Sequence, residues 1–138
     1  MISFQTWLPQ ILGYARFLAD SAAVHRAWIA GDSSETSVSG FDELYEQIFD
    51  DLDSNTFLGD LPSYMPSEDA AQDLIRRFLS QIESMDAARA ANGNMATAGD
   101  LLRSFEWGRL VEAARALSAL DQNRLMACAA RSAQLDRQ

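Results

Sequence analysis

Apolar residues recur along this chain mainly at intervals of three and four positions, the spacing that places side chains on one face of an α-helix. The clearest run extends over residues 41–52. Its apolar members occupy positions i, i+3, i+4, i+7, i+8 and i+11, namely Phe41, Leu44, Tyr45, Ile48, Phe49 and Leu52. No segment shows the valine, isoleucine and threonine alternation that is typical of strands. The spacing therefore predicts an all-α fold.

The same period continues elsewhere and predicts a bundle of five or six short helices. The expected helical segments are residues 6–19, 21–31, 41–52, 67–92, 97–105 with 107–120, and 121–138. Residues suited to N-capping stand near four of the starts, at Ser21, Ser67, Thr97 and Asp121. Residues 54–66 contain a glycine and two prolines, so we expect irregular structure there, with its apolar side chains resting on the core.

Length and composition favour one folded domain over residues 1–138. The chain is 48% hydrophobic, which is ample for a core. Trp7, Trp28 and Trp107 fall at inward positions of the predicted helices and are expected in that core. The last segment, residues 121–138, has a narrow alanine-rich face, so it is expected to pack loosely.

The N-terminal residues Met1–Thr6 carry no basic group, and polar residues interrupt the first apolar stretch. This pattern fits neither a secretory signal nor a membrane span and predicts a cytoplasmic protein. Cys128 is the single cysteine, which excludes an internal disulfide.

Negative charge is concentrated in the middle of the chain. Between Arg26 and Arg76 there is no positive charge and there are twelve carboxylates, from Asp32 to Asp73. The rest of the chain holds eight acids and eleven arginines, so the formal charge of −9 comes from this stretch. Such a field repels polyphosphates, which disfavours direct nucleic-acid binding, and it attracts cation-rich proteins.

Signatures of catalysis and of bound cofactors are weak. With one histidine, His25, and one cysteine, the chain cannot build a histidine and thiolate zinc site, and it has no glycine-rich nucleotide loop. Asp51–Asn55 matches the opening of a helix-flanked calcium loop, but Thr56 and Pro62 replace the glycine and the closing glutamate. We therefore expect no enzyme activity, metal or cofactor. The alternative is a divalent-metal protein or hydrolase that uses the carboxylates between Asp50 and Asp60.

The acidic face of the predicted helix at residues 41–52 departs from what stability alone favours. It holds no lysine or arginine, so ion pairs between positions i and i+4 cannot form within it. Asp50, Asp51 and Asp53 crowd its C-terminal end, where each carboxylate costs about 0.3–1 kcal/mol against the helix dipole. These features predict a surface that binds a basic protein partner. In the competing interpretation, Arg76, Arg77 or Arg103 neutralises the same face within the chain.

The predicted partner-binding residues combine charge with aromatic anchors. Tyrosines often supply the binding energy that charged contacts lack. The carboxylates expected to steer the partner are Asp42, Glu43, Glu46, Asp50, Asp51 and Asp53, and the anchors are Tyr45 and Tyr64. Tyr45 lies on the apolar stripe and is alternatively a core residue.

Residues 28–53 also carry a resemblance to a known family. In a small, acidic, helical chain, Trp28 is followed by a polar loop and then by the acidic amphipathic segment Phe41–Asp53. This arrangement resembles the immunity proteins of bacterial contact-dependent and polymorphic toxin systems. The resemblance implies a non-enzymatic inhibitor that binds a cognate toxin domain, commonly a basic nuclease, and covers its active or nucleic-acid-binding surface. A helical adaptor or oligomerisation module is a further alternative.

Overall fold

The computed structural model describes residues 2–31, 38–92 and 97–136, and the side chains as far as Arg131. Within these ranges the regular structure is helical and there is no strand, which confirms the predicted all-α class. The expected polar loop at residues 31–40 lies largely outside the described residues.

Five α-helices of eight or more residues supply most of the described structure. They are α1 (Phe4–Ala19), α2 (Ser21–Trp28), α6 (Asp69–Ala91), α8 (Phe105–Ser118) and α9 (Gln122–Asp136). The shorter elements are α3 (Phe41–Tyr45), the π-helix η1 (Glu46–Asp51), α4 (Ser54–Gly59), α5 (Leu61–Tyr64) and α7 (Ala98–Leu102). Because η1 follows α3 without a break, the two form one helical segment at the place predicted for the amphipathic acidic helix.

Two of the predicted helix caps are confirmed and two are wrong. The side chains of Thr97 and Asp121 accept hydrogen bonds from backbone N–H groups three residues later, at 3.1 and 3.2 Å. Asp20, and not Ser21, caps α2, because the chain is extended at Asp20. Ser67 has a left-handed backbone with φ of 67°, so it turns the chain before α6, which begins two residues later.

The prediction of irregular structure over residues 54–66 is wrong, since α4 and α5 occupy most of that stretch. Pro62 lies in the first turn of α5, where the helix needs no N–H group from it. Burial of Phe57, Leu61 and Met65 stabilises these two short helices against the core. The expected contact of the segment with the core is confirmed.

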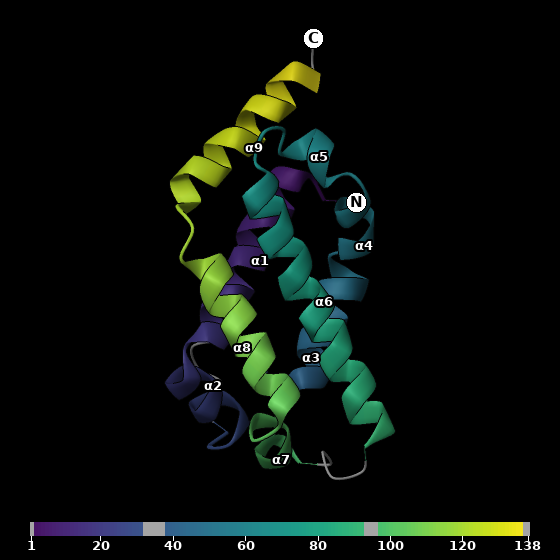
Figure 1. Ribbon diagram of the computed structural model, residues 1–138, viewed down its shortest axis with the longest axis vertical. Helices are drawn as coiled ribbons and strands as arrows, with labels where there is room; N and C mark the ends of the chain where they lie inside the picture. Colours follow the sequence, from purple (N-terminus) through teal and green to yellow (C-terminus); the bar gives the residue numbers. More distant parts are fainter. Residues whose placement is uncertain (1, 32–37, 93–96, 137–138) are drawn as a thin grey trace.

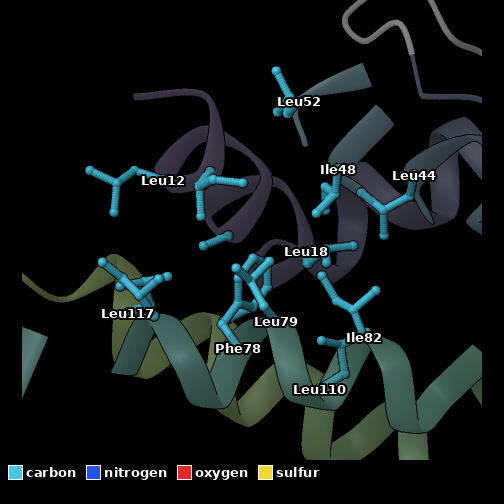
Figure 2. Packing of buried hydrophobic residues seen from close by; sticks show 14 of the residues in the cluster. Leu12, Leu18, Leu44, Ile48, Leu52, Phe78, Leu79, Ile82, Leu110 and Leu117 are labelled. Atoms are coloured by element: carbon cyan, nitrogen blue, oxygen red, sulfur yellow. The ribbon is translucent and has the colours of Figure 1, made fainter. Parts of the chain in front are cut away.

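The longer helices pack around a common core, with α8 in contact with both α1 and α6. In Figure 1, α6 and α8 run side by side, and α1 lies behind them. Figure 2 shows Leu18 of α1 near Ile48 of η1 and Leu44 of α3, with labelled side chains of α6 and α8 facing them. The three tryptophans are buried, as predicted.

The C-terminal helix α9 lies at one end of the molecule (Figure 1), where it contacts α1 and α5. Leu125, Cys128 and Ala129 are buried against the neighbouring helices. In the described parts of the chain, no helix combines the length and the apolar character needed to cross a bilayer.

Candidate functional site

The acidic segment, defined here as residues 42–53, is positioned by the apolar side of α3 and η1. Leu44 and Ile48 are fully buried, and this fixes the opposite face of the segment toward solvent. The second half of the segment is the wider π-helix η1, which ends where the N–H of Leu52 donates to the carbonyl of Gln47, five residues earlier, at 3.0 Å. Short π-helical stretches are rare and occur often at functional sites. A regular helix was expected here, so the π-helix is a finding of the structure.

Four of the eight predicted site residues border one cleft. This acidic cleft has a volume of about 570 Å³ and lies between the acidic segment, the end of α6 and α7. Its lining residues are Ser39, Gly40, Phe41, Asp42, Glu43, Glu46, Gln47, Asp51, Arg89, Thr97, Ala98 and Leu101. Asp50, Asp53, Tyr45 and Tyr64 lie outside it.

Asp42 is neutralised by a residue that the sequence analysis did not consider. Arg89, near the end of α6, hydrogen-bonds the carboxylate of Asp42 and also donates to Asp86 at 2.9 Å. Its guanidinium lies 5.0 Å from the centre of the Phe41 ring. Partial burial opposes its charge, yet the hydrogen bonds to Asp42 and Asp86 hold the pKa of Arg89 above its usual range. Asp42 is therefore less available to a partner than predicted.

Glu43 is held by hydrogen bonds to neutral groups. The hydroxyl and the backbone N–H of Ser39 both donate to its carboxylate, and Gln47 donates to it at 3.1 Å. Gln47 in turn accepts a 2.5 Å hydrogen bond from the hydroxyl of Tyr14 on α1. The hydrogen bonds from Ser39, helped by Gln47, lower the pKa of Glu43 below its usual value. The network fixes this carboxylate without cancelling its charge.

Glu46, Asp50 and Asp51 are exposed and form no ion pair within the part of the chain that the structure describes. Two of the arginines proposed as internal partners pair elsewhere. Arg76 lies 4.0 Å from Asp73, and Arg103 lies 2.9 Å from Asp100.

Arg77, the third proposed partner, is exposed and takes part in none of the ion pairs among the described residues. Within the described residues, Arg76, Arg77 and Arg103 therefore do not neutralise the acidic segment. Among the ion pairs of the described residues, the only one that involves the segment joins Arg89 to Asp42.

Asp53 ends the acidic segment in a left-handed conformation with φ of 50°. Aspartate tolerates this region better than most residues, and such a residue commonly terminates a helix. Its carboxylate accepts a 2.9 Å hydrogen bond from the hydroxyl of Thr56. Asp53 thus has a local structural role, which the charge pattern alone did not reveal.

The two predicted tyrosine anchors lie in different surroundings. Tyr45 is half-buried and its ring lies 4.7 Å from that of Phe49. Burial, and then the charges of Glu83, Asp86 and Asp50, raise the pKa of Tyr45. The charges of Glu83 and Asp86 on α6 therefore act on Tyr45, although no sequence spacing links α6 to the acidic segment.

Tyr64 is also half-buried and stacks on Phe4, with ring centres 4.5 Å apart and planes inclined by 3°. The stack fixes the orientation of its ring. Tyr64 does not line the acidic cleft, so the two tyrosines do not form a single pair of anchors there.

Groups suited to metal binding or nucleophilic catalysis are not gathered within the described ranges. No three histidine, cysteine, aspartate or glutamate side chains there could share a metal ion, and this includes the described carboxylates between Asp50 and Asp60. His25 is exposed on α2, whereas Cys128 is buried on α9.

Comparison of the chain with protein-family models, with curated proteins and with solved structures finds no match. The arrangement of charges around the acidic cleft therefore carries the functional interpretation. Arg89, Ser39 and Gln47 are the residues of this site that sequence reasoning missed. Only Gln47 had a sequence signal, because it falls on the same predicted helix as the carboxylates.

Proposed function

We propose that this chain is a non-enzymatic, cytoplasmic inhibitor of the immunity-protein type. Its partner is a basic toxin domain, a nuclease, whose active or nucleic-acid-binding surface it covers. One observation carries the proposal: Glu46 and Asp51 line the acidic cleft, and neither forms an ion pair within the described chain. Their charge is available to lysine and arginine side chains of another protein.

The position of the carboxylates explains how a partner is stabilised. Asp50 and Asp51 lie in the last turn of η1, which contains no basic residue. A carboxylate there costs about 0.3–1 kcal/mol because the C-terminal end of a helix carries partial negative charge. Cations on the partner would offset that cost on binding, and the concentrated negative field would speed the encounter.

Preorganisation supports the same function. Glu43 is fixed by Ser39 and Gln47, and Tyr64 is fixed by its stack on Phe4. Fixed side chains lose little conformational entropy on binding, which favours affinity. In this proposal Tyr45 and Tyr64 provide apolar contacts at two places beside the charged surface.

The first test is protection. A toxin domain encoded next to this chain is expressed with it in one cell, and growth is compared with that of cells expressing the toxin alone. We expect the wild-type chain to restore growth and the purified pair to associate. Growth that stays blocked, together with no association, would refute the inhibitor proposal for that toxin.

The second test measures association rates with matched variants. Glu46→Gln/Asp51→Asn removes two charges from the cleft, and Asp60→Asn/Glu112→Gln removes two exposed charges elsewhere. Raising salt from about 50 to about 500 mM should slow wild-type association about tenfold or more. At about 50 mM salt the cleft variant should associate more slowly than the control. Electrostatic docking at this cleft would be ruled out by equal association rates for the two variants. A wild-type association rate that does not change with salt concentration would also rule it out.

A further inference from the structure

A second concavity lies on a different part of the molecule and has the opposite character. This apolar pocket, of about 370 Å³, is formed where the end of α1, α2, the end of α7 and α8 meet. Leu18, Val24, Trp107 and Val111 supply its apolar wall. It shares no lining residue with the acidic cleft.

Groups able to donate hydrogen bonds stand at the pocket among these apolar side chains. They include the imidazole of His25 and the guanidinium of Arg115, both on exposed residues, and the hydroxyl of Ser21. Arg115 takes part in none of the ion pairs among the described residues. None of the described residues that line the pocket is acidic, although the chain as a whole has a formal charge of −9.

The combination defines the chemistry of a ligand. Small-molecule sites are typically concave and mainly apolar, with a few polar groups that orient the ligand. Here the apolar wall suits an aromatic or aliphatic body, and the polar groups complement a negative end group. Arginine in particular suits a carboxylate, because its planar guanidinium can donate two parallel hydrogen bonds.

We propose that this pocket binds a small organic monocarboxylate, with its apolar body against Trp107 and Val111 and its carboxylate at Arg115 and His25. This site is independent of the protein-binding function proposed above.

Gly108 provides a clean way to close the pocket. It lines the pocket from α8, and a Cβ added to it would meet no atom within 4 Å. A larger side chain can therefore be added at this lining position without displacing the core. Replacing a glycine inside a helix by alanine also stabilises the helix, by about 1 kcal/mol. Gly108→Leu should fill the pocket in a folded protein, and Gly108→Ala is its control.

The test uses 4-phenylbutyrate and its uncharged analogue 4-phenylbutanamide as probes, followed by amide chemical shifts in NMR spectra. For 4-phenylbutyrate we expect saturable binding with a Kd on the order of 1 mM, given the small number of atoms. Shifts should concentrate on α2 and on α8 around Trp107. The amide should bind about tenfold more weakly, because it lacks the charged hydrogen bonds.

Variants separate the two halves of the proposal. Arg115→Gln should weaken 4-phenylbutyrate about tenfold and change the amide little, whereas Arg77→Gln, the charge-matched control, should leave both unchanged. Gly108→Leu should abolish both interactions, and Gly108→Ala should retain them. Equal affinity for the two probes would overturn the carboxylate assignment. Shifts located elsewhere, no saturable binding, or undiminished binding to Gly108→Leu would overturn the site.

Discussion

The indole N–H of Trp7 donates a 2.9 Å hydrogen bond to the hydroxyl of Ser54, which lies 47 positions further along the chain. Ser54 donates in turn to the carbonyl of Ile48 at 2.6 Å. Trp7, Ser54 and Ile48 are fully buried. These two hydrogen bonds connect α1, through Ser54, to η1, the π-helix in the second half of the acidic segment.

Replacing Ser54 by alanine should therefore destabilise the protein by about 1–3 kcal/mol. The substitution leaves the buried indole N–H of Trp7 without an acceptor, and such unsatisfied groups are costly. Urea unfolding measures the change, with Ser80→Ala on the exposed side of α6 as a control expected within about 0.5 kcal/mol of wild type. Equal stabilities of the two variants would contradict a structural role for these two hydrogen bonds.

The stack of Tyr64 on Phe4 predicts different outcomes for two substitutions at position 64. Tyr64→Ala removes the ring and should cost about 1–3 kcal/mol, since both the aromatic contact and part of the buried area are lost. Tyr64→Phe preserves the ring and should change stability by less than about 0.5 kcal/mol. Thermal or urea unfolding distinguishes the two, and a comparable loss in both variants would show that the hydroxyl, and not the stack, matters.

Tyr14 should titrate above the ordinary tyrosine range. Burial, and then the charges of Asp51 and Glu43, raise the pKa of Tyr14. The folded state thus favours the neutral phenol. Its contribution to stability is complete below pH of about 10, the unfolded value, and is lost as pH rises through the higher pKa of the folded state.

Asp51→Asn removes one cause of that shift, so the pKa of Tyr14 should fall toward its ordinary value. Ultraviolet absorbance of tyrosinate reports the titration in a Tyr45→Phe/Tyr64→Phe background, where Tyr14 is the only remaining tyrosine. Asp60→Asn serves as the control and should leave the midpoint in place. An unchanged midpoint in the Asp51 variant would mean that this carboxylate lies too far from Tyr14 to act on it.

The ion pair between Glu68 and Arg124 should control local opening of α9. Arg124 hydrogen-bonds the carboxylate of Glu68, and the side chain of Gln5 donates to the carbonyl of Ala129 at 3.0 Å. Glu68→Gln should speed amide hydrogen exchange in α9 up to about fivefold while α6 and α8 keep their protection, because an ion pair with one exposed partner contributes below about 1 kcal/mol. Glu83→Gln is the matched control. Equal acceleration in all helices would indicate global destabilisation.

Some features could be predicted because they depend on the spacing of residue types within one segment. They are the all-α class, the burial of the three tryptophans and the location of the acidic segment. The spacing from Phe41 to Leu52 indicates a helical segment with one apolar face, because the whole pattern lies within the segment itself. Likewise, the caps at Thr97 and Asp121 act on backbone groups only three residues away.

Tertiary structure alone decided the features that depend on distant partners. Arg89 reaches Asp42 across 47 positions, and no spacing in the sequence encodes that pair. Ser54 fixes η1 through Trp7, and burial of Phe57 and Leu61 stabilises two short helices that Gly59 and Pro62 argued against. The physical reason is the same in each case. Periodicity and capping act within a few residues, whereas ion pairing, buried hydrogen bonds and packing free energy exist only once the helices have come together.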